Sequence, residues 1–166
     1  MGLEIERKFL LSGELSALLS DPRLVVRRRE RIDQTYLAID ETQELRVRRL
    51  TDPASGENAY THTFKNGNGL VREEIEYAIS GELYIQLTEA CGAVPLTKER
   101  ITATWDALLP VEIDRYETLG LTVAEVEFAS VAEAEAFEPP AWMGEDITHD
   151  RRYSNKKIWR ELQRTI

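Results

Sequence analysis

The chain has 166 residues, 42% of them hydrophobic and 31% charged, which is typical of one soluble globular domain spanning residues 1–166. Thirty acidic and 21 basic residues give a net charge of −9, and this balance argues against binding of nucleic acid through the overall field. Any anion-binding site must therefore be a local concentration of basic side chains.

Cysteine usage and the first residues indicate a compartment. Cys91 is the only cysteine, so the chain forms no internal disulfide, which fits a reducing environment. The chain begins with charged residues rather than a continuous apolar run, and no segment approaches the length of a membrane span. We therefore expect a cytoplasmic protein with no signal peptide and no membrane partner.

Alternating polar and apolar residues predict strands along most of the chain. In chain order, the pattern predicts a first strand around residues 3–9, a helix at 12–19, strands at 24–31, 34–39, 44–50, 60–65 and 70–79, a helix at 82–91, strands at 96–106, 108–117 and 123–129, and helices at 131–137 and from about 155. Turn clusters such as Asn66-Gly67-Asn68-Gly69 separate the strands. Hairpins dominate, so we predict an α+β, mainly β fold with an antiparallel sheet.

Charged residues recur at every second position of these strands, so they share one face of the sheet. For a single strand, a solvent-exposed outer face explains such a pattern. About six strands repeat it, however, and most of the pairs have the same sign. The acidic members of this face are Glu4, Glu6, Glu74, Glu76, Glu112, Asp114, Glu125 and Glu127. The basic members are Lys8, Arg46, Arg48, Lys65, Arg72, Lys98 and Arg100.

Like charges that neighbour one another on a sheet repel, so ligands of opposite charge are needed between them. A barrel with the charged face inward supplies that geometry, with cations on the acidic strands, an anion on the basic strands and the apolar face packed outward under the helices. Two divalent metals would bring the interior to a net charge of about +3, which suits a polyphosphate.

Six short motifs in order along the chain resemble the CYTH superfamily of triphosphate tunnel metalloenzymes, in its short bacterial form. They are E-I-E-R-K at the N-terminus, Q-T-Y-L, E-L-R-V-R, K-E-R, A-E-V-E-F and R-R-Y-S-N. The resemblance covers nearly the whole chain. It implies one CYTH domain folded as a closed eight-stranded antiparallel β-barrel, or tunnel, with a charged interior and a few flanking helices. It also implies dependence on Mg²⁺ or Mn²⁺ and a substrate with a linear triphosphate.

The resemblance also assigns roles to residues of the charged face. Lys8 and Tyr36 match a pair implicated in catalysis, with an aromatic packing role as the alternative for Tyr36. The expected metal-binding residues are Glu4, Glu6, Glu125 and Glu127, with Glu74, Glu76 and Asp114 as further candidates. The expected phosphate-binding residues are Arg46, Arg48, Lys65, Arg72, Lys98 and Arg100. Some relatives carry a third glutamate beside Glu125 and Glu127, where this chain has Val123 and Ala129. The number of bound metal ions, one or two, therefore stays open.

The predicted activity is hydrolysis of inorganic triphosphate to pyrophosphate and phosphate. Organic triphosphates, as used by thiamine triphosphatases, nucleoside triphosphatases and class IV adenylyl cyclases, remain alternatives because the inner charges recognise only the triphosphate. A non-catalytic polyphosphate-binding module is a third alternative, although a pure anion binder has little use for paired carboxylates. The expected partner is thus a triphosphate-bearing small molecule, with no nucleic acid, and a homodimer is left open. His149 is expected to lie in a loop.

Overall fold

The structure is a computed structural model that describes residues 2–165 of the chain. Strands dominate it, as the alternating sequence predicts. Their bounds are β1 (Gly2–Leu11), β2 (Leu24–Ile39), β3 (Gln43–Thr51), β4 (Asn58–Asn66), β5 (Val71–Ala78), β6 (Leu96–Trp105), β7 (Leu109–Tyr116), β8 (Leu121–Glu127) and β9 (Met143–Asp146).

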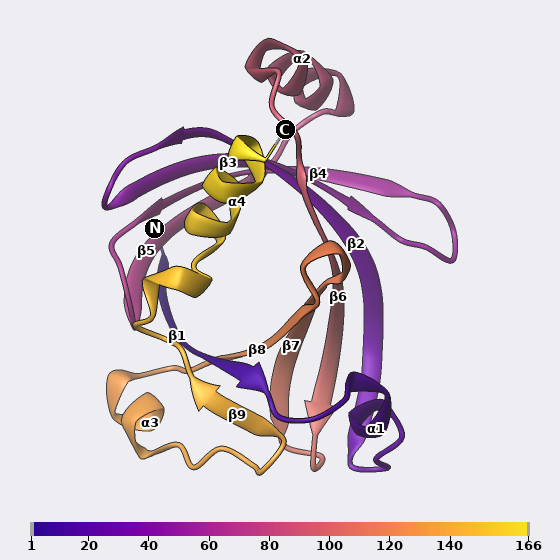
Figure 1. The fold of residues 1–166 in the computed structure, drawn as a ribbon, viewed down its shortest axis with the longest axis vertical. Helices are drawn as coiled ribbons and strands as arrows, with labels where there is room; N and C mark the ends of the chain where they lie inside the picture. The colour runs from indigo at the N-terminus through magenta and orange to yellow at the C-terminus, as the bar shows by residue number, and fades with distance from the viewer. Residues whose placement is uncertain (1, 166) are drawn as a thin grey trace.

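Eight of the strands described within residues 2–165 close into a barrel. Their order is β5-β4-β3-β2-β6-β7-β8-β1, and β1 pairs again with β5 to complete the ring that Figure 1 shows. All of these pairs are antiparallel. The short strand β9 adds to β1 on the outside. The predicted closed eight-stranded antiparallel barrel is therefore confirmed, and closure leaves it without free edges.

The strand β2 is longer than the sequence pattern predicts. The two predicted runs, 24–31 and 34–39, are one strand of 16 residues, with irregular pairing between Val26 and Arg28 and again between Tyr36 and Ala38. The alternation is obscured because Asp33 is buried on the outer face, where it accepts hydrogen bonds from Arg49 and Thr97. Such irregularities bend a strand, which lets β2 curve around the barrel.

Four α-helices flank the barrel in the described part of the chain. They are α1 (Leu15–Leu19), α2 (Gly81–Cys91), α3 (Val131–Ala136) and α4 (Asn155–Arg164), with short 3-10 turns η1 (Glu117–Leu119) and η2 (Arg151–Tyr153). Ser80, Ser130 and Ser154 begin α2, α3 and α4, and each hydroxyl accepts a hydrogen bond from a backbone amide in the first turn. None of the helices within residues 2–165 is long and apolar enough to cross a membrane.

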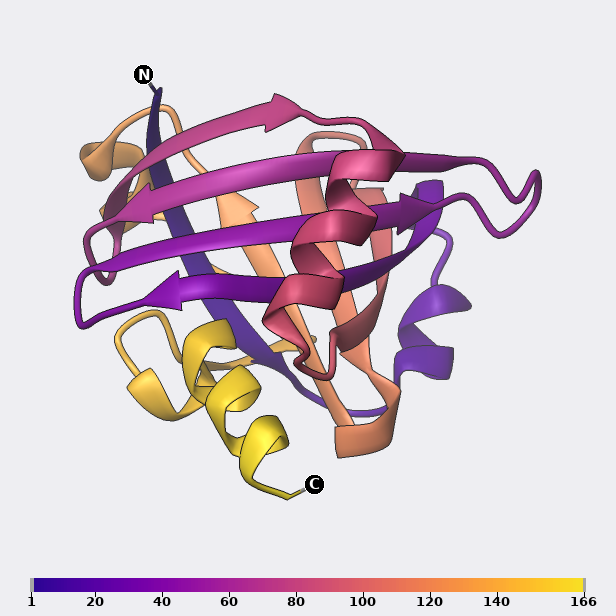
Figure 2. The ribbon, with the colours of Figure 1, turned by 90° about the horizontal axis from the view of Figure 1, so that it is seen from above.

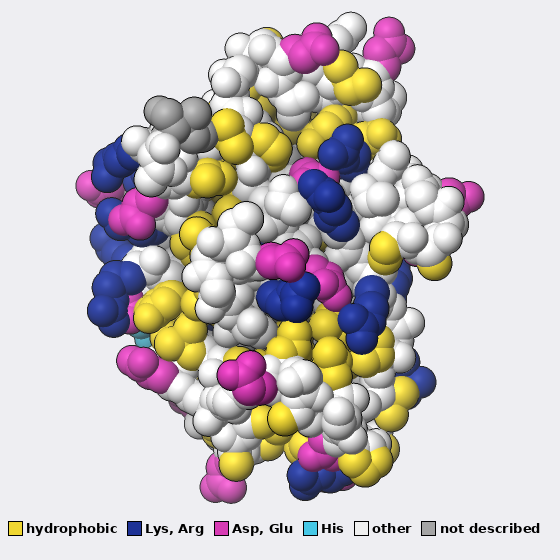
Figure 3. Space-filling model, turned by 45° about the vertical axis from the view of Figure 1, so that its right-hand side comes forward, with side chains coloured by type: hydrophobic (Ala, Val, Ile, Leu, Met, Phe, Trp, Pro, Cys, Tyr) yellow, Lys and Arg dark blue, Asp and Glu magenta, His cyan; other side chains and the backbone are white. Residues whose placement is uncertain are grey.

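One hydrophobic core lies on the outer face of the barrel. Its centre contains Phe9, Ile101, Ile113, Ala124 and Val126, each almost fully buried, and α1, α3 and β9 cover it. The helix α2 packs separately against the outer face of β2, β3 and β4, as Figure 2 shows. On the face drawn in Figure 3, basic, acidic and hydrophobic side chains are mixed. That face shows no sorting of charge by sign.

A second hydrophobic core lies inside one end of the barrel, in addition to the apolar face that packs outward. Tyr36, Leu96, Tyr116 and Val123 are inward-facing residues at this end, and Trp159 of α4 packs on them together with Ile158 and Ile147. The inward positions become apolar there because a helix, rather than solvent or ligand, fills the end of the barrel. The helix α4 therefore closes part of this end.

Candidate active site

A cavity of about 660 Å³ occupies the charged interior of the barrel. Its basic lining residues are Lys8, Arg46, Arg48, Lys65, Arg72, Lys98, Arg100, Arg151, Lys156, Lys157 and Arg160. Its acidic lining residues are Glu4, Glu6, Asp40, Glu41, Glu44, Glu74, Glu76, Glu112, Glu125, Glu127 and Asp150. The structure thus brings together thirteen of the fifteen predicted site residues, and the exceptions are Tyr36 and Asp114.

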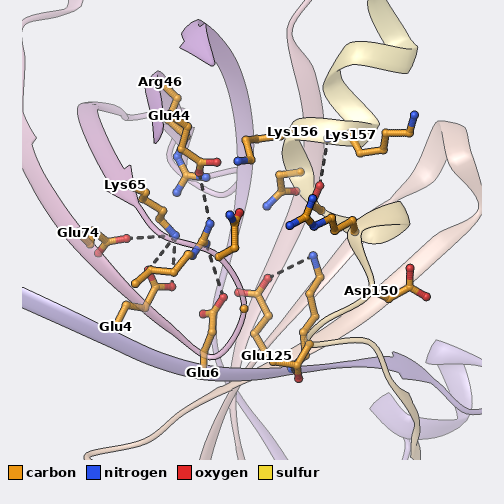
Figure 4. A pocket seen from close by; sticks show the side chains of 18 of the residues that line it. Glu4, Glu6, Glu44, Arg46, Lys65, Glu74, Glu125, Asp150, Lys156 and Lys157 are labelled. Carbon is orange, nitrogen blue, oxygen red and sulfur yellow. Dashed lines mark hydrogen bonds and ion pairs between the residues drawn. The ribbon is translucent and has the colours of Figure 1, made fainter. Parts of the chain in front are cut away.

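The residues of the opening motif face the cavity with their neighbours on β5 and β4. Lys65 lies between two carboxylates, with its Nζ 2.9 Å from Glu4 Oε2 and 3.2 Å from Glu74 Oε2 (Figure 4). Burial opposes ionisation of Glu4, but Lys65, Glu6 and Arg72 together outweigh it and lower the pKa of the Glu4 carboxyl. Arg72 lies opposite Glu4 on β5 and approaches Glu6 at 4.0 Å. Bases therefore neutralise this end of the acidic set.

Carboxylates meet directly where β8 runs between β1 and β7. Glu6 is paired with Glu127 across β1 and β8, and Glu112 is paired with Glu125 across β7 and β8. Burial raises the pKa of Glu6 and Glu112, and the charge of Glu125 raises both further. Burial and the charge of Glu4 raise the pKa of Glu127. Opposed like charges destabilise a sheet unless something neutralises them, so this region favours a proton or a cation.

The chemistry of these carboxylates fits a hard divalent cation, which prefers oxygen ligands. Within residues 2–165, however, no group of three or more His, Cys, Asp or Glu side chains is gathered closely enough to hold a metal ion. Instead, Lys65 lies between Glu4 and Glu74, as Figure 4 shows. A cation bound to these carboxylates would displace bases such as Lys65, which could then bind an anion. The residues present therefore fit a metal that binds together with its anionic substrate.

The basic half of the cavity is formed by β3 and β6. Arg46 and Arg48 are buried neighbours on the inner face of β3, and Arg48 donates to Glu76 at 2.9 Å. Burial, reinforced by the charge of Arg46, lowers the pKa of Arg48 to about 10. The guanidinium groups remain charged at neutral pH, but their like charges lie close together in a desolvated site. This arrangement favours a polyanion that takes up the excess positive charge.

Lys98 is a buried lysine whose pKa is unusually low. Burial lowers the pKa of its ammonium group to about 8, Asp114 opposes this effect, and Arg100 adds to it. The unfolded chain, with the ordinary lysine pKa of 10.5, binds more protons than the folded chain between these two values. The folded state should therefore gain stability as pH rises from about 8 to 10.5.

This pH effect is testable by urea unfolding of the empty protein. The free energy of unfolding of the wild type, minus that of Lys98→Met, should rise by up to about 1.4 kcal/mol per pH unit over this range. Subtracting the variant removes the contribution of the other titrating side chains. A difference that stays flat, or falls with pH, would show that Lys98 has an ordinary pKa.

Asp114, predicted as a further candidate metal ligand, lies between two bases. Its carboxylate is fully buried; Arg100 Nε and Nη2 donate to Oδ1 and Oδ2 at 2.8 Å, and Lys98 Nζ is 2.8 Å from Oδ2. Although burial favours the neutral acid, Arg100 and then Lys98 hold the pKa of Asp114 below its usual value. Bases thus contact both oxygens of Asp114, which sets it apart from the carboxylates that line the cavity.

Tyr36 faces inward but belongs to the second hydrophobic core rather than to the cavity lining. Its ring centroid is 5.6 Å from that of Trp159, and the side chain is only 3% exposed. The hydroxyl is buried and has no hydrogen-bond partner at bonding geometry among residues 2–165. Burial, followed by the charge of Glu44, raises the pKa of Tyr36 to about 12. The hydroxyl is therefore a protonated donor that lacks an acceptor in the empty barrel.

Lys8 does reach the cavity, on the opposite wall from Arg46. Its Nζ donates to the backbone carbonyl of Tyr153 at 2.9 Å and lies 3.9 Å from Glu125 Oε1. Its side chain is only 12% exposed. Lys8 and Tyr36 thus both point inward, and Tyr36 is paired across β2 and β3 with Arg46 of the cavity lining.

The C-terminal segment supplies lining residues that the charge pattern of the strands did not reveal. Arg151, Lys156, Lys157 and Arg160 come from η2 and α4, and Lys156 Nζ donates to the backbone carbonyl of Glu41 at 3.2 Å. No strand alternation marks a helix residue, so only tertiary packing places these bases at the cavity. Glu44, in contrast, shares the parity of Arg46 and Arg48 and could have been found.

His149 also lines the cavity, although the sequence predicts only a loop role for it. It lies against Gly69 of the β4–β5 turn, where a Cβ atom would come within 2.8 Å of His149 Nδ1. Gly69 also has φ of +79°, a conformation that favours glycine. The turn and the C-terminal segment therefore meet closely at this side of the cavity.

A closed antiparallel barrel whose interior sorts carboxylates and bases around one cavity defines a tunnel protein that binds a polyanion together with cations. Residues 2–158 match the CYTH domain in a comparison with known protein families, and the chain belongs to the CYTH family.

Curated relatives and solved structures agree with this assignment. The chain is 33% identical to an inorganic triphosphatase of Nitrosomonas europaea, over 93% of this chain and 95% of that protein. It is 32% identical to an inorganic triphosphatase of Acetivibrio thermocellus, over 95% and 94% of the two chains. A crystal structure of an inorganic triphosphatase superposes with a TM-score of 0.62 at 31% identity, covering 96% of this chain and 95% of that one.

Proposed function

We propose that this protein hydrolyses inorganic triphosphate to pyrophosphate and phosphate with a divalent cation. One observation carries the choice of substrate: beyond its charged residues, the cavity is lined only by Asn68, Gly69, Thr148, His149, Ser154 and Asn155 within residues 2–165. Such a lining includes no aliphatic side chain and no aromatic ring other than His149 among residues 2–165, whereas ligand sites for a thiazole or a purine are largely apolar or aromatic. The two curated relatives named as inorganic triphosphatases support the same choice.

The proposed cation is Mg²⁺ or Mn²⁺, held by Glu4, Glu6, Glu125 and Glu127. These carboxylates are oxygen ligands of the kind that both ions prefer. Glu74 and Glu76 lie on the adjoining wall and complete the acidic set. When bound, the cation supplies positive charge to the phosphate oxygens and lowers the cost of charge that develops in the reaction.

The chain's own residues bind the triphosphate and fix its orientation. Arg46, Arg48 and Arg100 present guanidinium groups suited to two-point contacts with phosphate, while Lys65, Arg72 and Lys98 add further positive charge. Phosphoryl transfer depends mainly on such positioning and on electrostatic stabilisation. The proposed role of Lys8 is to hold a proton at Nζ beside the reacting phosphate, on the wall that carries Glu125.

Substrate selectivity tests the proposal. We expect kcat/KM for tripolyphosphate to exceed that for ATP or thiamine triphosphate by at least about a hundredfold, because the cavity gives the organic groups little to contact. A phosphate-release assay with Mg²⁺ and then Mn²⁺ measures all three substrates. Equal or higher kcat/KM for either organic triphosphate would assign the protein to one of the other triphosphatase activities.

Tyr36→Phe separates a catalytic role of the tyrosine from a packing role. The substitution deletes a buried hydroxyl without a partner in residues 2–165, so the empty protein should be as stable as wild type or more stable. If this hydroxyl donates to the bound substrate or its water, kcat should fall about a hundredfold with little change in KM. Near-normal kcat would reduce Tyr36 to a packing residue beneath Trp159.

We also propose a cytoplasmic location. Cys91 is a free, exposed thiol, which fits a reducing compartment. The oligomeric state can be measured by light scattering, and a homodimer is compatible with the proposed function because the described residues of one chain surround the cavity.

A further inference from the structure

Asp114 differs from the carboxylates that line the cavity. Two acid pairs of the lining, Glu6 with Glu127 and Glu112 with Glu125, face each other across β1, β7 and β8. Asp114 is instead fully buried behind the lining and contacts two bases. Asp114 lies on β7, where its cross-strand partners are Val123 of β8 and Arg100 of β6. Its immediate surroundings are therefore one apolar wall and one basic wall.

The contacts of Asp114 fix the direction of both bases. Arg100 presents Nε and Nη2 to the two carboxylate oxygens at 2.8 Å, so the plane of its guanidinium group is held at two points. Lys98 Nζ lies 2.8 Å from Oδ2 and 5.6 Å from the centre of the Tyr116 ring. Arg100 Nη1 extends further, to Glu112 Oε2 at 2.9 Å. One carboxylate thus holds two cationic side chains that also line the cavity.

Arginine and lysine have many rotamers, and ordering them on a ligand costs conformational entropy. Side chains that are already held in a fixed direction lose less entropy when the ligand binds. A buried acid that holds both bases can therefore improve anion binding even though its own charge repels the anion.

We propose that Asp114 is a positioning residue that holds Lys98 and Arg100 in the orientation that binds phosphate. This inference rests on the proposed function, because it concerns the same triphosphate site. It also departs from a metal-binding role for Asp114. Its effect on the substrate is indirect and passes through the two bases, which are the groups that touch phosphate.

Positioning by Asp114 and simple electrostatics predict opposite changes in the affinity for tripolyphosphate when Asp114 is replaced. Asp114→Asn removes one negative charge near an anion site, so the field alone would tighten the binding of tripolyphosphate. If Asp114 acts by positioning, the same substitution weakens binding, because asparagine provides one acceptor oxygen where the carboxylate provides two. If Asp114 bound metal, the substitution would weaken metal binding and leave metal-free anion binding unchanged or tighter.

The experiment is calorimetric titration of tripolyphosphate into the full chain in EDTA, followed by steady-state kinetics with Mg²⁺. We expect Asp114→Asn to raise both the Kd in EDTA and the KM at least tenfold, with a smaller change in kcat. Glu99→Gln, on the outer face of β6, is the matched control with the same change of charge, and its Kd should stay within about twofold of wild type. Equal or tighter binding by Asp114→Asn would overturn the inference.

Asp114→Asn leaves Lys98 buried without its acid and could prevent folding, so a second pair of variants is needed. Lys98→Met keeps Asp114 and Arg100 together, and Lys98→Met/Asp114→Asn then removes the acid in a background without the buried lysine. Positioning predicts that the double variant binds tripolyphosphate more weakly than Lys98→Met alone, through Arg100. Equal or tighter binding by the double variant would overturn the inference. The proposed function fails separately, if wild type hydrolyses no tripolyphosphate with Mg²⁺ or Mn²⁺.

Discussion

Replacing Glu6 by Gln should lower kcat/KM for tripolyphosphate at least about a hundredfold, equivalent to about 2.7 kcal/mol of transition-state stabilisation. Glu6 lies opposite Glu127 and near Glu125, at the centre of the acidic wall proposed to hold the cation. The amide keeps the size of the side chain but removes the charge that a divalent cation needs. Titration of Mn²⁺ in the presence of tripolyphosphate should show correspondingly weaker metal binding.

The same substitution should stabilise the empty protein. Burial and Glu125 raise the pKa of Glu6 above its ordinary value of 4.5, so the folded chain binds more protons than the unfolded chain as pH rises above that value. The wild type therefore loses stability with rising pH, and Glu6→Gln does not share this loss. Urea unfolding should show a difference in favour of the variant that widens above pH 4.5.

A matched control is Glu73→Gln on the outward face of β5, next to the inward Glu74. This variant makes the same chemical change outside the cavity, and its kcat/KM should stay within about twofold of wild type. If Glu6→Gln retains full activity, or if both variants lose activity equally, the acidic wall of the barrel is not the metal site.

Replacing Arg48 by Gln should raise KM for tripolyphosphate at least about a hundredfold while the empty protein gains stability. Arg48 supplies a buried guanidinium to the cavity, so its loss removes a charge-assisted contact with phosphate. In the empty barrel, the same group is desolvated and adjoins Arg46, and these two effects lower its pKa to about 10. Relief of that cost should raise the melting temperature in the absence of ligand.

Arg49 provides the control because it is the next residue of β3 and faces outward, where Asp33 accepts its hydrogen bonds. Arg49→Gln should destabilise the protein, since it leaves the buried Asp33 with one base fewer, but KM should change little. Melting curves with and without tripolyphosphate measure both effects. A normal KM for Arg48→Gln, or the reverse pattern for the two arginines, would place the basic face outside the barrel.

Strand alternation predicted which side chains share the interior because a strand places every second residue on the same face. Glu4, Glu6 and Lys8 line the cavity together, as do Arg46 and Arg48. Placing the like-charged pairs of several strands on a solvent-exposed face would have left their mutual repulsion uncompensated. We inferred closure of the sheet from this repulsion. The pairing of β1 with both β8 and β5 confirms the closure.

Alternation could not predict what lies at the end of the barrel. Leu96, Tyr116 and Val123 have inward parity like the charged residues, yet they pack on Trp159 of α4. The position of a C-terminal helix depends on tertiary contacts rather than on local periodicity. For the same reason, Lys156 of α4 was missed as a lining residue.

Parity also could not distinguish a ligand-binding acid from a buried one. Asp114 and Glu125 both face inward on acidic strands, and the sequence assigns both to metal. Their surroundings differ because Asp114 is paired with Val123 and Arg100, whereas Glu125 is paired with Glu112 and Lys8. The cross-strand neighbours, which the sequence does not specify, thus give the two acids different surroundings.

Phosphorus NMR of tripolyphosphate incubated with the protein tests the proposed activity most directly. With Mg²⁺ or Mn²⁺, the substrate signals should give way to one pyrophosphate and one phosphate for each tripolyphosphate consumed, and excess EDTA should stop the conversion. The pyrophosphate should then persist, because the activity is proposed for the triphosphate. Intact tripolyphosphate in the presence of both metals, or undiminished conversion in EDTA, would contradict a metal-dependent inorganic triphosphatase.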